Sequence, residues 1–370
     1  MKLIILGRGN AGCLSAIHFS HFRNFTNKKV EIELIYDSKI KPVPTGQGTT
    51  VPFPISLFHS FGSSYVNSLP FTLKSGIMYE NWNPKNKKLF HGFPLGRYGL
   101  HFNPEDFQNY VCSNLKINFS EKDENIINYE NLDADFIIDC RGTPKTFENY
   151  DELINPLNCA LLAELPKKEN DVKYTRCVAT PDGWCFYIPL PTKTSVGYLY
   201  NNKITTLNKA TNNFKKLFKV KKINHIFPFS QYISKNPIVD KRVLLNGNKL
   251  FFLEPLEATA MGTYLWTARC HYSYIFENWT TKQTEEQIKD YIFKIQNFIL
   301  YHYSSYSIYK NKFWKYAKNL WDITETDTLD KELNTIKKFT NEEYEKTRSS
   351  DYQYAQWHQT SIRQWYEKDF

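Results

Sequence analysis

Two glutamates three residues apart are the first candidates for chemistry in this chain. They are Glu254 and Glu257, in the stretch 253–262 that reads L-E-P-L-E-A-T-A-M-G. A proline disfavours helix at the residue before it, and Pro255 itself suits the first turn of a helix. The stretch therefore predicts a strand that runs into a helix N-terminus, which attracts anions. The simpler interpretation is a proline-capped helix with glutamate in its first turn.

A lysine among apolar neighbours is the second candidate. Lys74 precedes residues 77–82, in which every second residue belongs to one set and the residues between to another, a pattern that favours a strand. Most lysines are solvated surface charges, but a lysine in an apolar cavity is a proton donor of adjustable pKa. His91 and Phe93 would face the same way on an extended segment. They would form either a flat aromatic slot or a part of the core.

The N-terminus reads as strand, glycine-rich turn, helix and strand. Residues 3–6 predict a buried strand, 13–22 an apolar helix and 30–36 a second strand, followed by Asp37. The turn reads G-x-G-x-x-G and contains Gly7, Gly9, Ala11 and Gly12. Such a turn lets the backbone approach a pyrophosphate, and an acidic residue after the second strand can bind a ribose hydroxyl. The pattern predicts dinucleotide binding; the alternative is a glycine turn in an α/β unit without a ligand.

Two further segments are candidates for a cofactor site. The loop that contains Gly48 and Thr49 either lies over a flavin or its phosphates or is a plain connection. An apolar strand ends at Asp139 and is followed by Gly142. In flavoproteins with two dinucleotide folds, a strand of this kind closes on the diphosphate side of the cofactor.

The middle of the chain predicts a second sheet, and its end predicts helices. Residues 183–190 and 195–200 look like two adjacent strands, and the first places Trp184 and every second residue after it on one face. Apolar residues recur at helical spacing in 284–303 and in 327–346. We expect these helices to be scaffold.

The composition restricts the class of protein. The 370 residues suffice for two domains or one large one, and 41% of them are hydrophobic, enough for a substantial core. The net charge of +9 comes largely from lysines beside asparagines, which favours a solvated surface over a nucleic-acid groove. Seven cysteines without a C-x-x-C or a metal-binding spacing predict a reducing, cytoplasmic compartment and no metal. No segment approaches the about 20 apolar residues that a membrane span needs.

Taken in order, these motifs resemble those of the flavin-dependent tryptophan halogenase family. The family has an N-terminal G-x-G-x-x-G, a lysine before an x-I-x-F-x-N-W strand, a W-x-W-x-I-P segment and E-P-L-E-S-T-G. This chain has the glycine turn, Lys74 before I-x-Y-x-N-W, W-x-F-x-I-P from Trp184, and E-P-L-E-A-T-A from Glu254. The resemblance covers roughly residues 1–320, and four motifs in the family's order are far more specific than any one of them.

The resemblance implies an α/β fold with an FAD-binding, Rossmann-like domain of the glutathione-reductase type. A mixed β-sheet would form the substrate layer, with a helical C-terminal part packed on it. The expected boundaries are 1–70, 103–160 and 240–280 for the FAD-binding module, 71–102 and 161–239 for the substrate-side sheet, and 281–370 for the helical C-terminal region.

The resemblance also implies cofactors and partners. A separate flavin reductase would supply reduced FAD, which with dioxygen and chloride or bromide yields hypohalous acid. The implied FAD-binding residues are Gly7, Gly9, Ala11, Gly12, Asp37, Gly48, Thr49, Asp139, Gly142, Trp184 and Pro255. The protein would be a monomer or a homodimer, without nucleic acid or membrane partners.

The catalytic residues implied by the resemblance are Lys74 and Glu257. The halide would bind near Thr259 and Ala260. Lys74 would either hydrogen-bond the hypohalous acid or form a haloamine, and would so present the electrophilic halogen. Glu257 would help to position the halogen and take the proton from the substrate, and the two groups of opposite charge would tune each other's pKa. The walls of the pocket for an indole or another small electron-rich aromatic would be His91, Phe93 and Trp357.

The chain departs from the family's motifs at three positions. Phe186 replaces the second tryptophan and loses its N–H donor, and Ala258 replaces a serine. Ala260 replaces a glycine, and alanine is penalised there if the backbone needs a positive φ. Two alternatives stay open: a related FAD-dependent monooxygenase, or a degenerate, non-catalytic flavoprotein. Retention of both Lys74 and Glu257 speaks against the second alternative.

Overall fold

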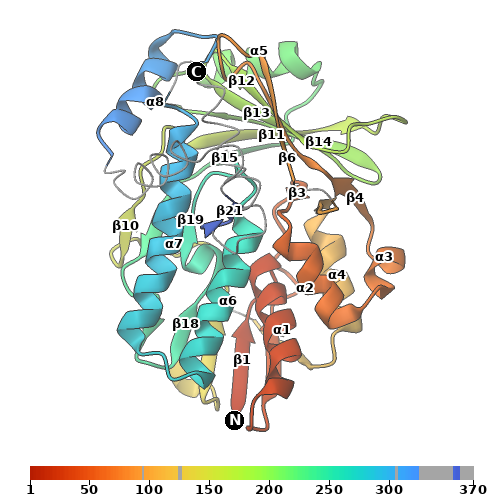
Figure 1. Cartoon of the computed structure of the whole chain (residues 1–370), viewed down its shortest axis with the longest axis vertical. Coiled ribbons are helices and arrows are strands. Elements are labelled where there is room, and N and C mark those ends of the chain that lie inside the picture. The colour runs from red at the N-terminus through yellow and green to blue at the C-terminus, as the bar shows by residue number, and fades with distance from the viewer. Residues whose placement is uncertain (94–95, 124–126, 305–306, 325–352, 359–370) are drawn as a thin grey trace, which may run out of the picture.

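Two large β-sheets organise the chain, one towards each end of its long axis, with helices between and around them (Figure 1). The computed structural model describes residues 1–93, 96–123, 127–304, 307–324 and 353–358. The helix predicted at 327–346 lies outside these residues. The mixed α/β architecture predicted from the sequence is confirmed.

The six-stranded sheet is the one that carries the glycine turn. β1 (Lys2–Leu6) pairs in parallel with β2 (Glu31–Tyr36) on one side and with β9 (Phe136–Asp139) on the other. The outer strands complete the order β17-β18-β9-β1-β2-β8, and they are β8 (Asn118–Glu121), β17 (Ile238–Val239) and β18 (Val243–Leu245). Four of the five residues of β1 are buried, as a central parallel strand covered on both faces requires. The predicted first two strands and the helix after the first are therefore confirmed to within a few residues.

The seven-stranded sheet is mostly antiparallel and has one buried face towards the site. Its order is β15 (His225–Pro228), β11 (Cys159–Pro166), β14 (Lys193–Tyr200), β13 (Gly183–Pro189), β12 (Thr175–Thr180), β5 (Gly76–Glu80) and β6 (Lys88–Gly92). The predicted pairing of the two strands that became β13 and β14 is confirmed. Trp184 and Phe186 lie in the main core on one face, whereas Cys185 packs with the cluster on the other.

Small sheets and a hairpin bridge the two large sheets. One small sheet has the order β3 (Gln47–Gly48), β7 (Gly99–Phe102), β4 (Phe71–Lys74), and another has the order β10 (Tyr150–Glu152), β16 (Tyr232–Ser234), β19 (Phe251–Phe252). The hairpin consists of β20 (Gln353–Tyr354) and β21 (Trp357–His358). Lys74 ends β4, and the chain enters the seven-stranded sheet two residues later at Gly76. Lys74 therefore stands at the junction of two sheets.

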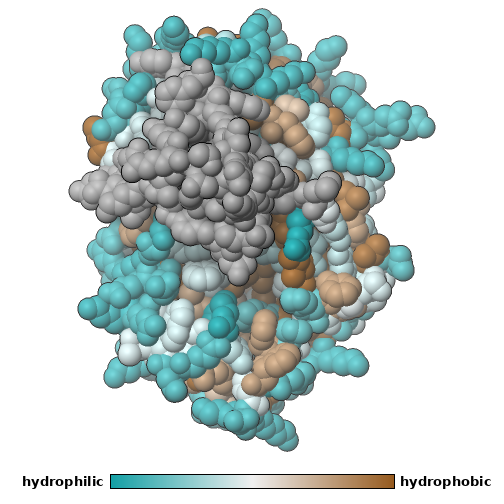
Figure 2. All heavy atoms as spheres, in the orientation of Figure 1, coloured by the Kyte–Doolittle hydropathy of each residue, from teal (hydrophilic) through white to brown (hydrophobic). Residues whose placement is uncertain are grey.

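Helices cover the parallel sheet and close the core. α1 packs along α6, and α6 packs along α7, side by side in Figure 1. The helices are α1 (Asn10–Phe22), α2 (Pro52–Phe61), α3 (Ser64–Ser68), α4 (Pro104–Asn114), α5 (Leu207–Phe218), α6 (Ala260–Phe276), α7 (Thr281–Tyr301) and α8 (Lys312–Asp322), with 3-10 turns η1 (Arg23–Phe25), η3 (Tyr129–Asn131) and η4 (Gly247–Lys249). The helix predicted at 284–303 is confirmed as α7. Among the described residues, no helix is both long and apolar enough to cross a bilayer. On the face drawn in Figure 2, the coloured residues are largely hydrophilic, with small apolar patches among them.

A tight turn separates the glutamate motif from its helix. The prediction that Pro255 lies in the first turn of that helix is wrong, because α6 begins only at Ala260. The Ala258 N–H donates to the Pro255 carbonyl at 3.0 Å, and Ala258 has a φ of 55°. The positive φ that was considered for Ala260 therefore falls on Ala258, and Ala260 has helical geometry.

Candidate active site

Glu257 is the centre of a buried polar cluster. Its Oε1 accepts a hydrogen bond from the Tyr79 hydroxyl at 2.5 Å and lies 2.7 Å from His302 Nε2. Its Oε2 accepts a hydrogen bond from Trp357 Nε1 at 3.0 Å. His91 Nδ1 lies 3.4 Å from Oε1, at an ion-pair distance but without an aligned hydrogen bond. We call these five residues the Glu257 cluster.

The histidines of this cluster determine the charge of Glu257. The residue is only 2% exposed, and burial alone disfavours a carboxylate. Burial therefore raises the pKa of Glu257, but His91 and His302 outweigh it and hold the pKa well below its usual range. Glu257 is consequently an anion at neutral pH.

Lys74 presents a buried amine next to this cluster. Its side chain is fully buried, and its Nζ has no hydrogen-bond partner among the described residues. Burial lowers the pKa of Lys74 to about 8, and the negative charge of Glu257 limits this decrease. The Nζ lies 5.5 Å from the centre of the Phe93 ring, and a Cβ added at Gly48 would lie 3.5 Å from it. The amine thus lies between the loop at Gly48 and the aromatic side of the site.

Glu254 is the centre of a second polar cluster. Its carboxyl accepts hydrogen bonds from Trp184 Nε1 at 3.3 Å and from the Tyr303 hydroxyl at 3.0 and 3.1 Å. Its backbone N–H donates to the Gln231 side chain. Burial raises the pKa of Glu254 to about 7, although Trp184 and Tyr303 act in the opposite direction. We call these four residues the Glu254 cluster.

The N-terminus of α6 is in contact with the hairpin near the end of the described chain. Thr259 precedes the helix, and its carbonyl accepts a hydrogen bond from Gln356 Nε2 at 2.7 Å. The same nitrogen donates to Thr263 Oγ1, and the Thr50 hydroxyl donates to Gln356 Oε1 at 2.9 Å. Gln356 therefore joins the helix end predicted for the halide to the loop predicted for the cofactor.

The glycine turn after β1 is shaped for close approach of a ligand. Gly7 has a φ of 91°, and a Cβ on Gly12 would lie 1.8 Å from the Gly7 carbonyl oxygen, so both positions require glycine. Gly9 caps α1, and a Cβ there would meet no atom of the described residues within 4 Å. This opening at a helix N-terminus fits a diphosphate, because backbone N–H groups and the helix dipole favour an anion. Ala11 packs instead against Gly247 of η4.

Several other residues that were predicted to bind the cofactor form hydrogen bonds with groups of the protein itself. Asp37 follows β2 and accepts a hydrogen bond from the backbone two residues later. Asp139 ends β9 and accepts three hydrogen bonds from Arg141, while Thr49 Oγ1 accepts one from a backbone N–H. Gly142 has a φ of 44°, and no atom of the residues that the structure describes lies within 4 Å of where its Cβ would be. Their roles towards a cofactor stay predictions.

The sequence profile of the tryptophan halogenase family matches residues 2–126 and 120–367. The chain belongs to the tryptophan halogenase family. The family predicted from four short motifs is thus confirmed over nearly the whole chain. Flavin-dependent halogenation, with FAD and a halide, is the chemistry that membership implies.

Several solved structures share the fold of this chain at low sequence identity. BrvH, a flavin-dependent halogenase from Brevundimonas sp. BAL3, is 14% identical with a TM-score of 0.79, over 99% of this chain and 89% of that one. A tryptophan halogenase from Shewanella frigidimarina is 17% identical with a TM-score of 0.78, over 99% and 88%. The tryptophan 6-halogenase SttH from Streptomyces toxytricini is 14% identical with a TM-score of 0.76, over 90% and 84%.

Several polar residues of the site were not predicted from the sequence. They are Tyr79 and His302 of the Glu257 cluster, Gln231 and Tyr303 of the Glu254 cluster, and Gln356 at the N-terminus of α6. His302 and Tyr303 directly follow the long apolar helix α7, so a polar pair at the end of an apolar run was the available signal. Gln356 gave no such signal, because its contacts come from elements more than 90 residues away.

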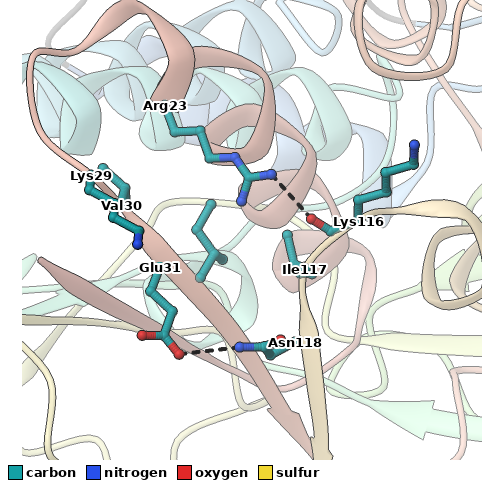
Figure 3. Close-up of a pocket in the computed structure, with 8 residues that line it drawn as sticks. Arg23, Lys29, Val30, Glu31, Lys116, Ile117 and Asn118 are labelled. Atoms are coloured by element: carbon teal, nitrogen blue, oxygen red, sulfur yellow. Dashed lines mark hydrogen bonds between the residues drawn. The ribbon is translucent and has the colours of Figure 1, made fainter.

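A surface pocket of about 470 Å³ is lined by no residue of the two clusters. Figure 3 shows the residues that line it. It is lined by the first residues of β2 and β8, including Glu31 and Asn118, which are hydrogen-bonded to each other. These are the amino ends of parallel strands, whereas ligands of such sheets bind at the carboxyl ends. The pocket therefore has no part in the candidate site.

Proposed function

We propose that this chain is an FADH2-dependent halogenase that uses Lys74 to deliver halogen to an electron-rich aromatic such as an indole. The observation that carries the proposal is the buried Lys74 amine, which has no hydrogen-bond partner among the described residues. Its pKa of about 8 lies close to neutrality, where a group can both give and take a proton.

The predicted cofactor residues suit this chemistry. Gly7, Gly9 and Gly12 would hold the FAD diphosphate, Asp37 the ribose, and the backbone at Thr259 and Ala260 the halide. When bound, reduced FAD supplies two electrons, so that with O2, a halide and a proton it gives FAD, hypohalous acid and water. A separate reductase would return the FAD to its reduced form. All seven cysteines are free, which supports a reducing compartment such as the cytoplasm.

Lys74 would transfer the proton in the halogenation step. As an ammonium group it donates a proton to the oxygen of hypohalous acid while the aromatic carbon bonds to the halogen and the O–halogen bond breaks. Water leaves, and the Lys74 amine then takes the ring proton, which restores both the aromatic ring and the ammonium. The low pKa of Glu257 makes it a weak base, so Lys74 is the better acceptor of the ring proton.

The substrate would lie on the aromatic side of Lys74. Phe93 faces the Lys74 Nζ, and His91 and Trp357 both contact Glu257. Each of the three side chains that the sequence suggested as pocket walls thus lies near Lys74 or Glu257, which supports this placement of the substrate. Flat aromatic walls favour a flat aromatic substrate by stacking.

A mass-spectrometric turnover assay tests the proposal. Purified protein, FAD, a flavin reductase, NADH and bromide or chloride would be incubated with a panel of indoles and phenols. We expect a halogen mass shift that Lys74→Ala lowers by at least about 100-fold, the scale of one general acid or base. Lys88→Ala, at an exposed position on β6, is the matched control and should keep the activity. Oxygen addition in place of halogen would contradict the proposal and indicate a monooxygenase.

A further inference from the structure

The ring of His302 faces a hydrogen-bond acceptor at each of its two nitrogens. Its Nδ1 lies 2.6 Å from the carbonyl oxygen of Phe298, one turn earlier in α7. Its Nε2 lies 2.7 Å from Glu257 Oε1. The side chain is fully buried, so water does not substitute for either partner.

Two acceptors require two donors. A neutral imidazole carries only one N–H, whereas an imidazolium carries two. The backbone carbonyl has no proton to give, and Glu257 also accepts hydrogen bonds from Tyr79 and Trp357, which marks it as a carboxylate. The arrangement is satisfied when His302 is cationic and Glu257 is anionic.

We propose that His302 is a positioning residue: it remains doubly protonated and fixes Glu257 as a hydrogen-bonded anion, so that Lys74 faces a neutral pair rather than a lone carboxylate. The effect on catalysis rests on the proposed function, but the charge state of His302 does not.

The neutral pair has a direct consequence for Lys74. An uncompensated carboxylate in a buried site strongly favours a neighbouring ammonium. With His302 cationic, much of that attraction is cancelled, and the Lys74 amine remains able to release its proton near neutral pH. Besides His302 and Lys74, the titratable groups that interact electrostatically with Glu257 are Tyr79 from β5, His91 from β6 and Cys177 from β12. Of the two histidines, only His302 is hydrogen-bonded to the carboxylate.

Nitrogen-15 NMR of histidine-labelled full-length protein tests the charge state without any turnover. At pH about 7.5, one unit above the pKa of about 6.5 of an ordinary histidine, we expect one imidazolium with both nitrogens protonated. His302→Gln should remove this signal, and Glu257→Gln should convert it to a neutral imidazole. A neutral His302 in the unmodified protein would overturn the proposal, whether or not the chain is a halogenase.

The pH profile of halogenation tests the consequence for Lys74. His302→Gln keeps an N–H donor for Glu257 but removes the charge, so a role in hydrogen bonding alone would leave the profile unchanged. We expect its alkaline limb to move up by about one pH unit, a tenfold change in the amine fraction. His271→Gln changes a buried histidine that has no hydrogen-bond partner in the described part of the chain, and it should cause no shift. An unshifted limb in His302→Gln would overturn the proposed effect on Lys74. If His302→Gln does not fold, His302→Asn gives the same comparison.

Discussion

The Glu257 and Glu254 clusters surround two carboxyls that lie three residues apart, and they shift the pKa values of these carboxyls in opposite directions. Glu254 is 1% exposed and Glu257 is 2% exposed, so burial does not distinguish them. The pKa of Glu254 is raised to about 7, whereas that of Glu257 is held well below its usual range. The difference lies in the donors, because Trp184 and Tyr303 are neutral while histidines can carry a positive charge.

This difference assigns distinct tasks to the two carboxyls. Ionising a buried group is costly unless an opposite charge compensates it. Of the two carboxyls, only Glu257 has such compensation, and only Glu257 contributes to the shift in the pKa of Lys74. We infer that Glu257 supplies charge to the reacting centre, whereas Glu254 joins β13 to the residues after α7.

The largest expected effect separates the two carboxyls by activity. Glu257→Gln should reduce product formation about a thousand-fold, which corresponds to an activation free energy higher by about 4 kcal/mol. The substitution removes the anion beside Lys74 and the counter-ion of His302. Glu254→Gln, the matched control, should remain within about tenfold, since Glu254 does not contribute to the shift in the pKa of Lys74. The measurement is kcat/KM in the turnover assay, with thermal midpoints to show that both variants fold. Equal losses in the two variants would contradict the comparison.

Local patterns predicted the elements that carry the site but not their convergence. The glycine turn and the alternation from Trp184 depend on neighbours in sequence, so both were predicted correctly. The pairing of His302 with Glu257 joins residues 45 positions apart through tertiary packing, and no local period reports it. The start of α6 was misplaced because the turn at Ala258 overrode the local preference of Pro255.

The second expected effect is on stability as a function of pH. The pKa of Glu254 rises from 4.5 to about 7 on folding, so its contribution is complete below pH 4.5 and is lost as the pH rises through about 7. Over those 2.5 units the loss is about 3 kcal/mol. Glu254→Gln lacks this titration. Relative to the unmodified protein, the variant should therefore gain about 3 kcal/mol between pH 4.5 and pH 8. Chemical denaturation at both pH values measures this gain, and a parallel pH dependence of the two proteins would refute it.

The smallest expected effect concerns the turn that holds the two carboxyls apart. Ala258 has a φ of 55°, a conformation that costs alanine roughly 1 kcal/mol and glycine almost nothing. Ala258→Gly should therefore stabilise the protein by about 0.5 kcal/mol after the greater flexibility of glycine in the unfolded chain is subtracted.

Ala260→Gly, two residues later, is the matched control. It should instead destabilise the protein by a few tenths of a kcal/mol, about the cost of glycine in a helix end. Denaturation midpoints of the two variants, compared at one pH, test the opposite signs. Stabilisation by Ala260→Gly would mean that the helix end, and not the turn between the carboxyls, carries the backbone strain.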